Sequence, residues 1–374
     1  ENIIFKNNAS GNNIIAEIDG PLSVFMETGL NGMPSNFSIF DLPGNSNITV
    51  SNAIGENVGL GSFLVTYDQL ETLDTINVNS KKTSGDFYTE NIGILNLNFK
   101  ESVLANNSDF KFDASTKVII NAEQGFTIRD FIGDLSSELD ALEELVITSG
   151  GAVSIDSTKN TDKLEIINIV STDEFLANSL GSGNLSTLSL ESTNSDLNIN
   201  KINASNSGNV TTINLIAKGA ISNGAGSASV IESATGGINA NLSRTSGESN
   251  SNEDQVDFVV STVDSGTVNL TTTRTSGLVS TIENAGTENS NQSSTIKLGN
   301  ASDSKNNQIT LRGTVDNVIL TGGTGEDIIK FDNSNKIKSV NFNLATGYDK
   351  IDFQNIQNVN GTLTEYGLVI NLSD

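Results

Sequence analysis

Apolar residues occur along this chain in short runs that are separated by Asn, Ser, Thr, Gly and Asp. The runs are about 3 to 7 residues long and rich in β-branched side chains, a pattern that predicts β-strands. Their spacing of about 10 to 14 residues indicates a β-solenoid or a β-sandwich. The clearest runs are Leu164–Ile169, Leu185–Leu190, Leu197–Ile202, Val210–Ile216, Val256–Val260, Val268–Leu270, Ile309–Leu311, Val318–Leu320 and Ile337–Leu344.

Two features of the composition favour the solenoid. The three prolines are Pro21, Pro34 and Pro43, so the later strands keep the backbone donors that each rung of a solenoid gives to the next. About one residue in seven is Asn, a residue that tolerates left-handed turns and can stack in ladders between coils. The sequence therefore predicts an all-β fold, a parallel β-helix or β-solenoid with few short helices.

An internal repeat supports this fold. The segment Arg244–Gly247 (Arg-Thr-Ser-Gly) returns as Arg274–Gly277, and the offset between the two copies fits one long rung or two short ones. Over residues 150–370 we expect rungs of about 22 residues, stacked ~4.8 Å apart around threads of Ile, Val and Leu.

One segment carries a candidate metal-binding motif. Gly322–Lys330 (Gly-Gly-Thr-Gly-Glu-Asp-Ile-Ile-Lys) matches the nonapeptide pattern G-G-x-G-x-D-x-U-x at every specified position, and this pattern describes half a turn of a calcium-bound parallel β-roll. Gly323 and Gly325 let the backbone bend tightly and turn its carbonyl oxygens inward, and Asp327 offers a carboxylate to a hard cation. The alternative interpretation is a glycine-rich turn without metal.

Further copies of the motif matter, because each calcium ion in such a roll lies between successive turns. The second half of the motif returns downstream at Gly347 and Asp349, at an offset slightly longer than two nonapeptides. A degenerate copy of the motif lies upstream, where Asn317, next to Asp316, replaces the key Asp. Asp254–Phe258 has a similar ending but no glycine turn before it, so we interpret it as an ordinary strand. The candidate metal residues are Gly323, Gly325, Asp327, Gly347, Asp349, Asp316 and Asn317.

The motif resembles that of RTX proteins, the calcium-binding repeat proteins that Gram-negative bacteria secrete in one step by type I export. The resemblance covers roughly residues 311–353 and has one full copy instead of an uninterrupted series, which leaves the number of bound ions open. We expect three regions, namely residues 1–130 as an irregular N-terminal β region, residues 131–310 as a β-solenoid with a short helical insert near 134–145, and residues 311–374 as an RTX-like β-roll segment.

Helix signals are scarce. Within the insert, leucines recur at i, i+4 and i+7 after the candidate N-cap Asp134, and the predicted helix reaches Leu145. A second, shorter helix is predicted to start at Thr172 or Asp173 and to end before Gly181.

Charge and missing residue types narrow the chemistry. The chain has 45 acidic and 20 basic residues, a net charge of −25, which argues against nucleic acid or a bare anionic membrane as a direct partner. It has no Cys and no His, which excludes disulfides and thiolate catalysis and removes the commonest metal ligand and general base. Oxygen ligands remain, and they favour calcium.

Two further features bear on membranes and on the extent of the chain. No apolar run reaches the ~18 to 20 residues that span a bilayer, so we expect no transmembrane segment. The chain starts at Glu1 without Met or a signal peptide, and we therefore expect a fragment of a longer protein that lacks its native N-terminal part.

Enzyme function is an alternative, because parallel β-helices also host polysaccharide enzymes. The chain has no His, four Tyr and few basic residues, whereas such catalysis needs a base or a pair of acids. Candidate pairs such as Asp254 with Asp257, or Asp349 with Asp352, are interpreted as strand-face and loop carboxylates. We expect the chain not to be an enzyme.

The calcium motif, the acidity, the absence of Cys, His and Trp, and the Asn-rich solenoid pattern together resemble the surface-layer (S-layer) proteins of Gram-negative bacteria that leave by type I export. This resemblance implies a structural protein on the cell surface with Ca2+ as cofactor, which assembles with copies of itself into a two-dimensional lattice. It also implies attachment to lipopolysaccharide through a part of the protein outside this chain. The alternatives are an RTX-type secreted adhesin for a host or matrix ligand and, third, a polysaccharide-active β-helix enzyme.

Overall fold

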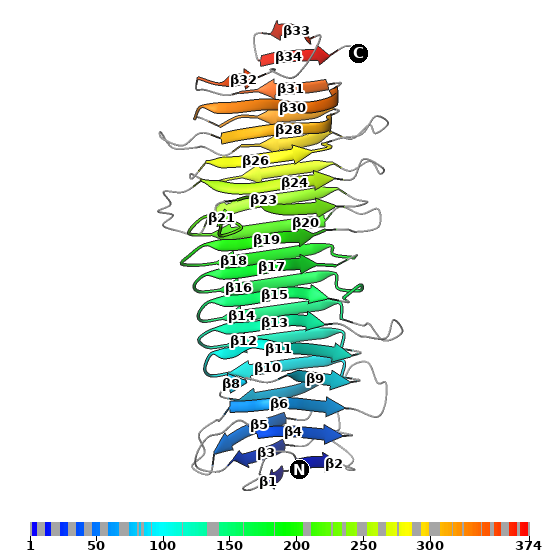
Figure 1. The fold of residues 1–374 in the computed structure, drawn as a ribbon, viewed down its shortest axis with the longest axis vertical. Helices are drawn as coiled ribbons and strands as arrows, with labels where there is room; N and C mark the ends of the chain where they lie inside the picture. Colours follow the sequence, from blue (N-terminus) through cyan, green and yellow to red (C-terminus); the bar gives the residue numbers. More distant parts are fainter. Residues whose placement is uncertain are drawn as a thin grey trace. The chain divides into compact units, whose positions relative to one another are not determined.

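A computed structural model describes the chain apart from residues 1, 6–11, 16–22, 29–34, 41–46, 53–58, 67–74, 81, 84–85, 91, 114, 133–141, 160, 183, 205–210, 226, 234–236, 245–252, 261–266, 275–276, 286–292, 299–306, 316, 324, 338, 345–347, 353–358, 365–366 and 373–374. Every regular element in the described residues is a β-strand, and parallel pairing prevails (Figure 1). The fold is a parallel β-solenoid, as the sequence predicts. The described residues contain no helix with the length and apolar character to cross a membrane.

The chain divides into two compact units, Glu1–Asn178 and Ser179–Asp374. In each unit the strands alternate between two sheets, here named sheet A and sheet B. In unit 1, sheet A consists of β1 (Asn2–Phe5), β3 (Ser23–Thr28), β5 (Asn47–Asn52), β7 (Thr75–Ser80), β10 (Ile94–Phe99), β12 (Lys117–Ala122), β14 (Glu144–Ser149) and β16 (Ile166–Ser171), paired in that order. Sheet B consists of β2 (Asn12–Ile15), β4 (Ser35–Phe40), β6 (Gly59–Thr66), β8 (Lys82–Thr83), β9 (Phe87–Glu90), β11 (Val103–Asp113), β13 (Phe126–Ile132) and β15 (Val153–Lys159).

The core of unit 1 consists of inward side chains that stack in columns from rung to rung. Strands β7, β10, β12 and β14 alternate between buried and more exposed residues, the pattern of a sheet with one face on a core. Three phenylalanines continue the core in sheet B, where the ring of Phe110 lies 5.4 Å from that of Phe87 and 6.1 Å from that of Phe131. One column of sheet A, fully buried, runs through Val78, Leu97, Ile120, Ile147 and Ile169.

Unit 2 repeats this arrangement and ends in a hairpin. The boundary between the units lies within β17 (Phe175–Gly181). Sheet A of unit 2 consists of β18 (Thr187–Ser192), β20 (Thr211–Ala217), β23 (Ile238–Arg244), β25 (Val268–Thr272), β27 (Ser294–Lys297), β29 (Val318–Thr321) and β31 (Ser339–Asn343), followed by the antiparallel β34 (Gly367–Leu372) and β33 (Val359–Thr364). Sheet B consists of β19 (Leu197–Asn203), β21 (Ile221–Ser222), β22 (Ser229–Ser233), β24 (Asp254–Val260), β26 (Leu278–Glu283), β28 (Asn307–Val315), β30 (Asp327–Ile337) and β32 (Lys350–Asp352).

The two sequence repeats are rung repeats. Strand β23 pairs with β25 so that Ile238 lies opposite Val268, and this offset equals that between the two Arg-Thr-Ser-Gly segments. Strand β30 pairs with β32 so that Ile328 lies opposite Lys350, and this offset equals that between Asp327 and Asp349. Both offsets that the sequence shows are therefore confirmed as the length of one rung.

The helix predictions are wrong where the structure describes their residues. Leu145 lies in strand β14, whereas residues 133–141 lie outside the described residues. The second predicted helix is strand β17, in which Phe175 and Ala177 are buried and Leu176 is exposed. Alternating burial from Phe175 to Asn178 shows that tertiary pairing in the rung overrides the local helix signal.

Asparagine side chains form the ladders that the composition suggested. In unit 1, Nδ2 of Asn98 donates to Oδ1 of Asn79 at 3.0 Å, and Nδ2 of Asn121 donates to Oδ1 of Asn98 at 2.9 Å. In unit 2, Nδ2 of Asn269 donates to Oδ1 of Asn239 at 2.8 Å. These amides join the outward faces of consecutive rungs, because a parallel register brings identical positions together.

Candidate cation site at Asp327 and Asp349

One column of residues marks the first position of successive sheet B strands in unit 2. The pairing of β24, β26, β28 and β30 aligns these residues, and the register of β32 adds the residue that precedes it. In chain order, this strand-start column runs through Asp254, Leu278, Asn307, Asp327 and Asp349.

Asp and Asn side chains in the strand-start column bond back to the preceding rung. Oδ1 of Asn307 accepts the N–H of Leu278 at 3.0 Å, and Oδ1 of Asp349 accepts the N–H of Asp327 at 2.9 Å. A side-chain oxygen satisfies a backbone donor here, where the chain enters the strand from a turn. The column therefore gathers carboxylates at one corner of the solenoid for a structural reason.

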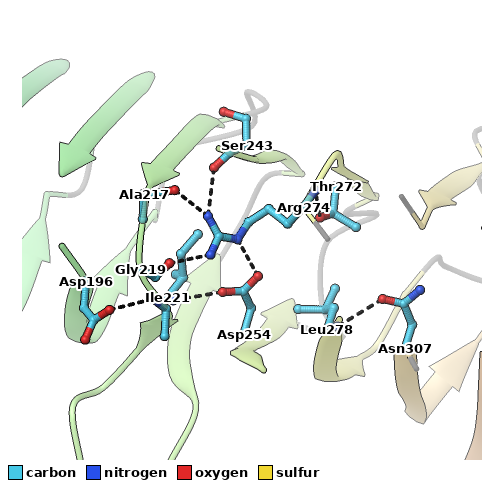
Figure 2. A network of polar contacts seen from close by, with 11 residues as sticks. Asp196, Ala217, Gly219, Ile221, Ser243, Asp254, Thr272, Arg274, Leu278 and Asn307 are labelled. Atoms are coloured by element: carbon cyan, nitrogen blue, oxygen red, sulfur yellow. Dashed lines mark hydrogen bonds and ion pairs between the residues drawn. The ribbon is translucent and has the colours of Figure 1, made fainter. Parts of the chain in front are cut away.

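Asp254 is neutralised by an arginine inside the protein. Nε of Arg274 donates to Oδ2 of Asp254 at 2.5 Å, and both side chains are 1% exposed. The same guanidinium donates to the backbone carbonyls of Ala217 at 2.6 Å, of Ser243 at 3.2 Å and of Gly219, as Figure 2 shows. This arrangement meets the two needs of a buried charge, a counter-ion and hydrogen-bond partners.

Asp327 occupies the same column, yet no Lys or Arg pairs with it in the part of the chain that the structure describes. The residue is 0% exposed. Oδ2 of Asp327 accepts the N–H of Gly323 at 3.0 Å, and Oδ1 accepts Nδ2 of Asn307 at 2.8 Å. A Cβ on Gly322 would lie 2.5 Å from Oδ2, so a larger residue there would have to displace the carboxylate. The hydrogen bonds come from neutral donors and leave the charge uncompensated.

The pKa of Asp327 reflects this uncompensated charge. Burial raises the pKa of its carboxyl group above the ordinary value, and the negative charge of Asp349 raises the pKa further, while the hydrogen bonds from Asn307 and Gly323 lower it. A carboxyl group in such a setting is protonated or matched by a bound cation. Because the pKa is raised by burial together with a like charge, the corner is a candidate cation site.

The structure places most residues of the downstream motif at this corner. Gly323 and Gly325 lie in the turn that leads into β30, and Gly323 contributes its N–H to Asp327. Asp349 lies one rung further, as the spacing of the two motif copies predicts. Gly347 lies outside the described residues.

The upstream copy of the motif lies elsewhere. Asn317 precedes β29, a strand of sheet A, whereas Asp327 begins a strand of sheet B. Asn317 adopts a φ of 52°, and its carbonyl accepts the N–H of Ser294 at 3.1 Å. Its left-handed turn explains why Asn is suited to the position. Asp316 lies outside the described residues.

The donor chemistry at the corner fits a hard cation. Calcium takes about 6 to 8 oxygen ligands, and the two carboxylate oxygens of Asp327, which accept one hydrogen bond each, keep lone pairs for a further partner. Among the described residues, no three or more His, Cys, Asp or Glu side chains are grouped so that they could hold a metal ion together. Asp327 and Asp349 would therefore hold the ion together with backbone carbonyls and water, as calcium sites with few carboxylates do.

The acid pairs considered for catalysis have structural partners. Asp254 is buried with Arg274, whereas Asp257 lies on the outer side of the same strand, where its Oδ1 accepts the N–H of Thr281 at 2.6 Å. Asp352 pairs with Lys350 at 3.3 Å. These residues are carboxylates of strands, in line with the interpretation from the sequence.

Sequence reasoning missed two residues of this corner. Asn307 lies one rung before Asp327 and supports its carboxylate, and a search for residues one rung apart could have found it. Arg274 is part of the Arg-Thr-Ser-Gly repeat, but its counterpart Arg244 is exposed, so the repeat gives no sign of the buried ion pair.

Comparison of the chain with protein-family models, with curated protein sequences and with solved structures gives no match.

Proposed function

We propose that this chain is a calcium-binding structural part of a bacterial surface layer, which assembles with copies of itself into a two-dimensional lattice. The observation that carries the proposal is the buried carboxylate of Asp327, one rung before Asp349 and without a Lys or Arg partner among the described residues. Ca2+ supplies at this corner the positive charge that Arg274 supplies to Asp254 three rungs earlier. The match of Gly322–Lys330 to the calcium nonapeptide supports the choice of metal.

Calcium has a second role in the proposal, at the level of assembly. A surface that carries a net charge of −25 repels its copies, and monovalent salt screens this repulsion without supplying ligand geometry. Divalent ions compensate the charge and order the corner on binding, because ligand binding to the folded state alone stabilises it. The lattice therefore forms in calcium and dissolves in chelator.

The remaining parts of the proposal follow the resemblance to type-I-exported surface-layer proteins. The protein is exported to the surface of a Gram-negative cell and is held on lipopolysaccharide by a part outside this chain. No residue is assigned a catalytic role. The carboxylates that were considered bond to Arg274, Thr281, Lys350 or, for Asp349, the N–H of Asp327.

Electron microscopy of the purified chain tests the proposal. Ordered sheets are expected in millimolar calcium and dispersed particles in chelator with sodium chloride. The matched variants are Asp327→Asn, which should need more calcium to assemble, and Asp332→Asn, a surface carboxylate paired with Arg312 at 2.9 Å, which should behave as the parent. A chain that stays dispersed in calcium contradicts the lattice and supports the adhesin alternative. Sheets that form equally well in chelator contradict the role of calcium.

A further inference from the structure

The outward side of sheet A in unit 2 presents two long columns of uncharged polar side chains. One column runs from Thr187 on β18 to Asn341 on β31, and the other runs from Ser189 to Asn343 on the same strands. The residues in both columns are Asn, Thr or Ser, with the exceptions Ile319 and Lys297. They are exposed or half-buried. We call these two columns the neutral face.

The two columns of the neutral face contain no carboxylate, although the chain carries 45 acidic residues. Glu191, outward at the end of β18, borders the second column. The outward side of sheet B in the same unit differs. It carries Asp257 and Glu283, and it holds surface ion pairs between Lys201 and Glu232 at 2.5 Å and between Arg312 and Asp332 at 2.9 Å. The neutral face and the outward side of sheet B thus differ in electrostatic character.

The neutral face is also preorganised. Nδ2 of Asn241 donates to Oδ1 of Asn214 at 3.3 Å, and Nδ2 of Asn269 donates to Oδ1 of Asn239 at 2.8 Å. Oδ1 of Asn269 accepts the N–H of Thr295 at 3.0 Å as well. Side chains that are already fixed in the free protein lose less conformational entropy when a partner covers them.

We propose that the neutral face is a contact surface between copies of this chain, in which the face of one copy packs on the same face of another. This inference rests on the proposed self-assembly and names the surface that carries it. A face without carboxylates lets two strongly acidic chains approach without bringing like charges together. Flat sheet faces with Asn and Thr pack against each other through interdigitated polar ladders. An anionic partner is a poorer fit, because Lys297 is the one cationic side chain in the two columns.

The neutral face is small, and its size fits a weak contact that occurs many times in a lattice. Its strands stack at ~4.8 Å per rung, so seven rungs give a length of roughly 30 Å. Such a contact is smaller than a stable dimer interface needs, and it becomes effective when every copy engages several neighbours at once.

Charge insertion tests the inference in the full chain. The variant Asn241→Asp with Thr271→Asp places two carboxylates at the centre of the neutral face, and we expect ordered sheets to require roughly tenfold more protein, because apposed like charges cost more than ~1.4 kcal/mol. The control variant Gln255→Glu with Thr310→Asp adds the same charge to the outward side of sheet B and should assemble as the parent does. Circular dichroism and melting in calcium should be equal for the two variants.

Cysteine crosslinking tests the face without a lattice. The chain has no native cysteine, so Thr271→Cys introduces the single thiol on β25, the middle strand of the face. A contact of like faces brings the residue near its own copy, and mild oxidation should give disulfide dimers, whereas Thr310→Cys on β28 should stay monomeric.

Dimers of Thr271→Cys in a chain that forms no sheets would support the contact while contradicting the lattice. Sheets from the acidic variant at the parent's concentration, with Thr271→Cys monomeric, would overturn the inference and leave the lattice standing. Thr271→Cys that stays monomeric and adsorbs to a crystalline polysaccharide would overturn it too.

Discussion

Asp349 accepts the backbone N–H of Asp327 through its Oδ1 at 2.9 Å, so two carboxylates occupy the same corner on consecutive rungs. The sequence spacing of one rung between them creates this relationship, and burial of Asp327 gives it an electrostatic cost. Three rungs earlier, Arg274 removes that cost for Asp254. Asp327 has no such counter-ion among the described residues, and we propose that Ca2+ takes this role.

Without calcium, Asp327 should make folding less favourable as the pH rises. Its pKa is raised in the fold above 3.8, so the folded state binds the proton more tightly than the unfolded state does. The stability contribution is therefore full below pH ~3.8 and is lost as the pH rises through the folded pKa. Urea unfolding in chelator at several pH values should show this slope in the difference between the parent and Asp327→Asn. A difference that stays constant over pH ~3 to 7 would contradict the raised pKa.

Asp109 in unit 1 should show the opposite pH dependence. Arg129 donates to it from Nε at 2.8 Å and from Nη2 at 2.6 Å, and these hydrogen bonds lower the pKa of Asp109 below 3.8. Its contribution is full above the unfolded pKa and is lost as the pH falls through the folded pKa. Asp109→Asn should therefore be less stable than the parent at neutral pH and approach it at strongly acidic pH. Equal stability of the two proteins at neutral pH is the outcome that would disprove this.

Removal of Arg274 should destabilise unit 2 strongly. Arg274→Met leaves Asp254 as a buried carboxylate without its counter-ion and leaves the carbonyl of Ala217 without its donor. The expected loss in the free energy of unfolding is about 3 to 5 kcal/mol. The control Arg312→Met breaks an exposed pair and should cost about 1 kcal/mol or less. A second change, Asp254→Leu, should restore part of the loss, and chemical denaturation measures all of these variants. Equal losses for Arg274→Met and its control would contradict the buried ion pair.

Truncation of a side chain in the buried column of unit 1 should leave a cavity and destabilise the fold. Ile147 is fully buried between Ile120 and Ile169 on neighbouring rungs. Ile147→Ala should lower the free energy of unfolding by about 2 to 5 kcal/mol. Thr148→Ala on the exposed side of the same strand should change it by about 0.5 kcal/mol or less. Denaturant midpoints that coincide for the two variants would show that the column is not a packed core.

The solenoid was predictable because its signal is local and repeated. Short runs such as Val268–Leu270 and Ile309–Leu311 are strands because alternate residues face the core, and this pattern survives in the sequence. The offset of the glycine motif gave the rung length correctly, whereas the offset of the Arg-Thr-Ser-Gly segment fitted one long rung or two short ones until the pairing of β23 with β25 decided for one. The helix predicted to start at Thr172 or Asp173 was wrong because the local sequence does not show which residues the neighbouring rungs will bury.

The two aspartates of the candidate site could be predicted from the sequence, whereas the residues around them could not. Asp327 and Asp349 follow from the glycine motif and its spacing. Asn307 follows no glycine motif, so only its distance of one rung from Asp327 marks it in the sequence, although its amide supports Asp327. Arg274 follows a strand of sheet A, whereas its partner Asp254 begins a strand of sheet B, and no local pattern marks this pairing.

The central claim is that calcium compensates the buried charge at Asp327 and Asp349, and thermal unfolding of the parent and of Asp327→Asn tests it most directly. A ligand at about 100 times its dissociation constant stabilises the folded state by about 2.7 kcal/mol, which raises the melting temperature of a cooperative unit the size of unit 2, Ser179–Asp374, by roughly 5 to 10 °C. The account predicts such a rise for the parent when chelator is replaced by calcium, most of it lost in Asp327→Asn and most of it kept in Asn317→Ala. Identical melting of the parent in calcium and in chelator would contradict the account.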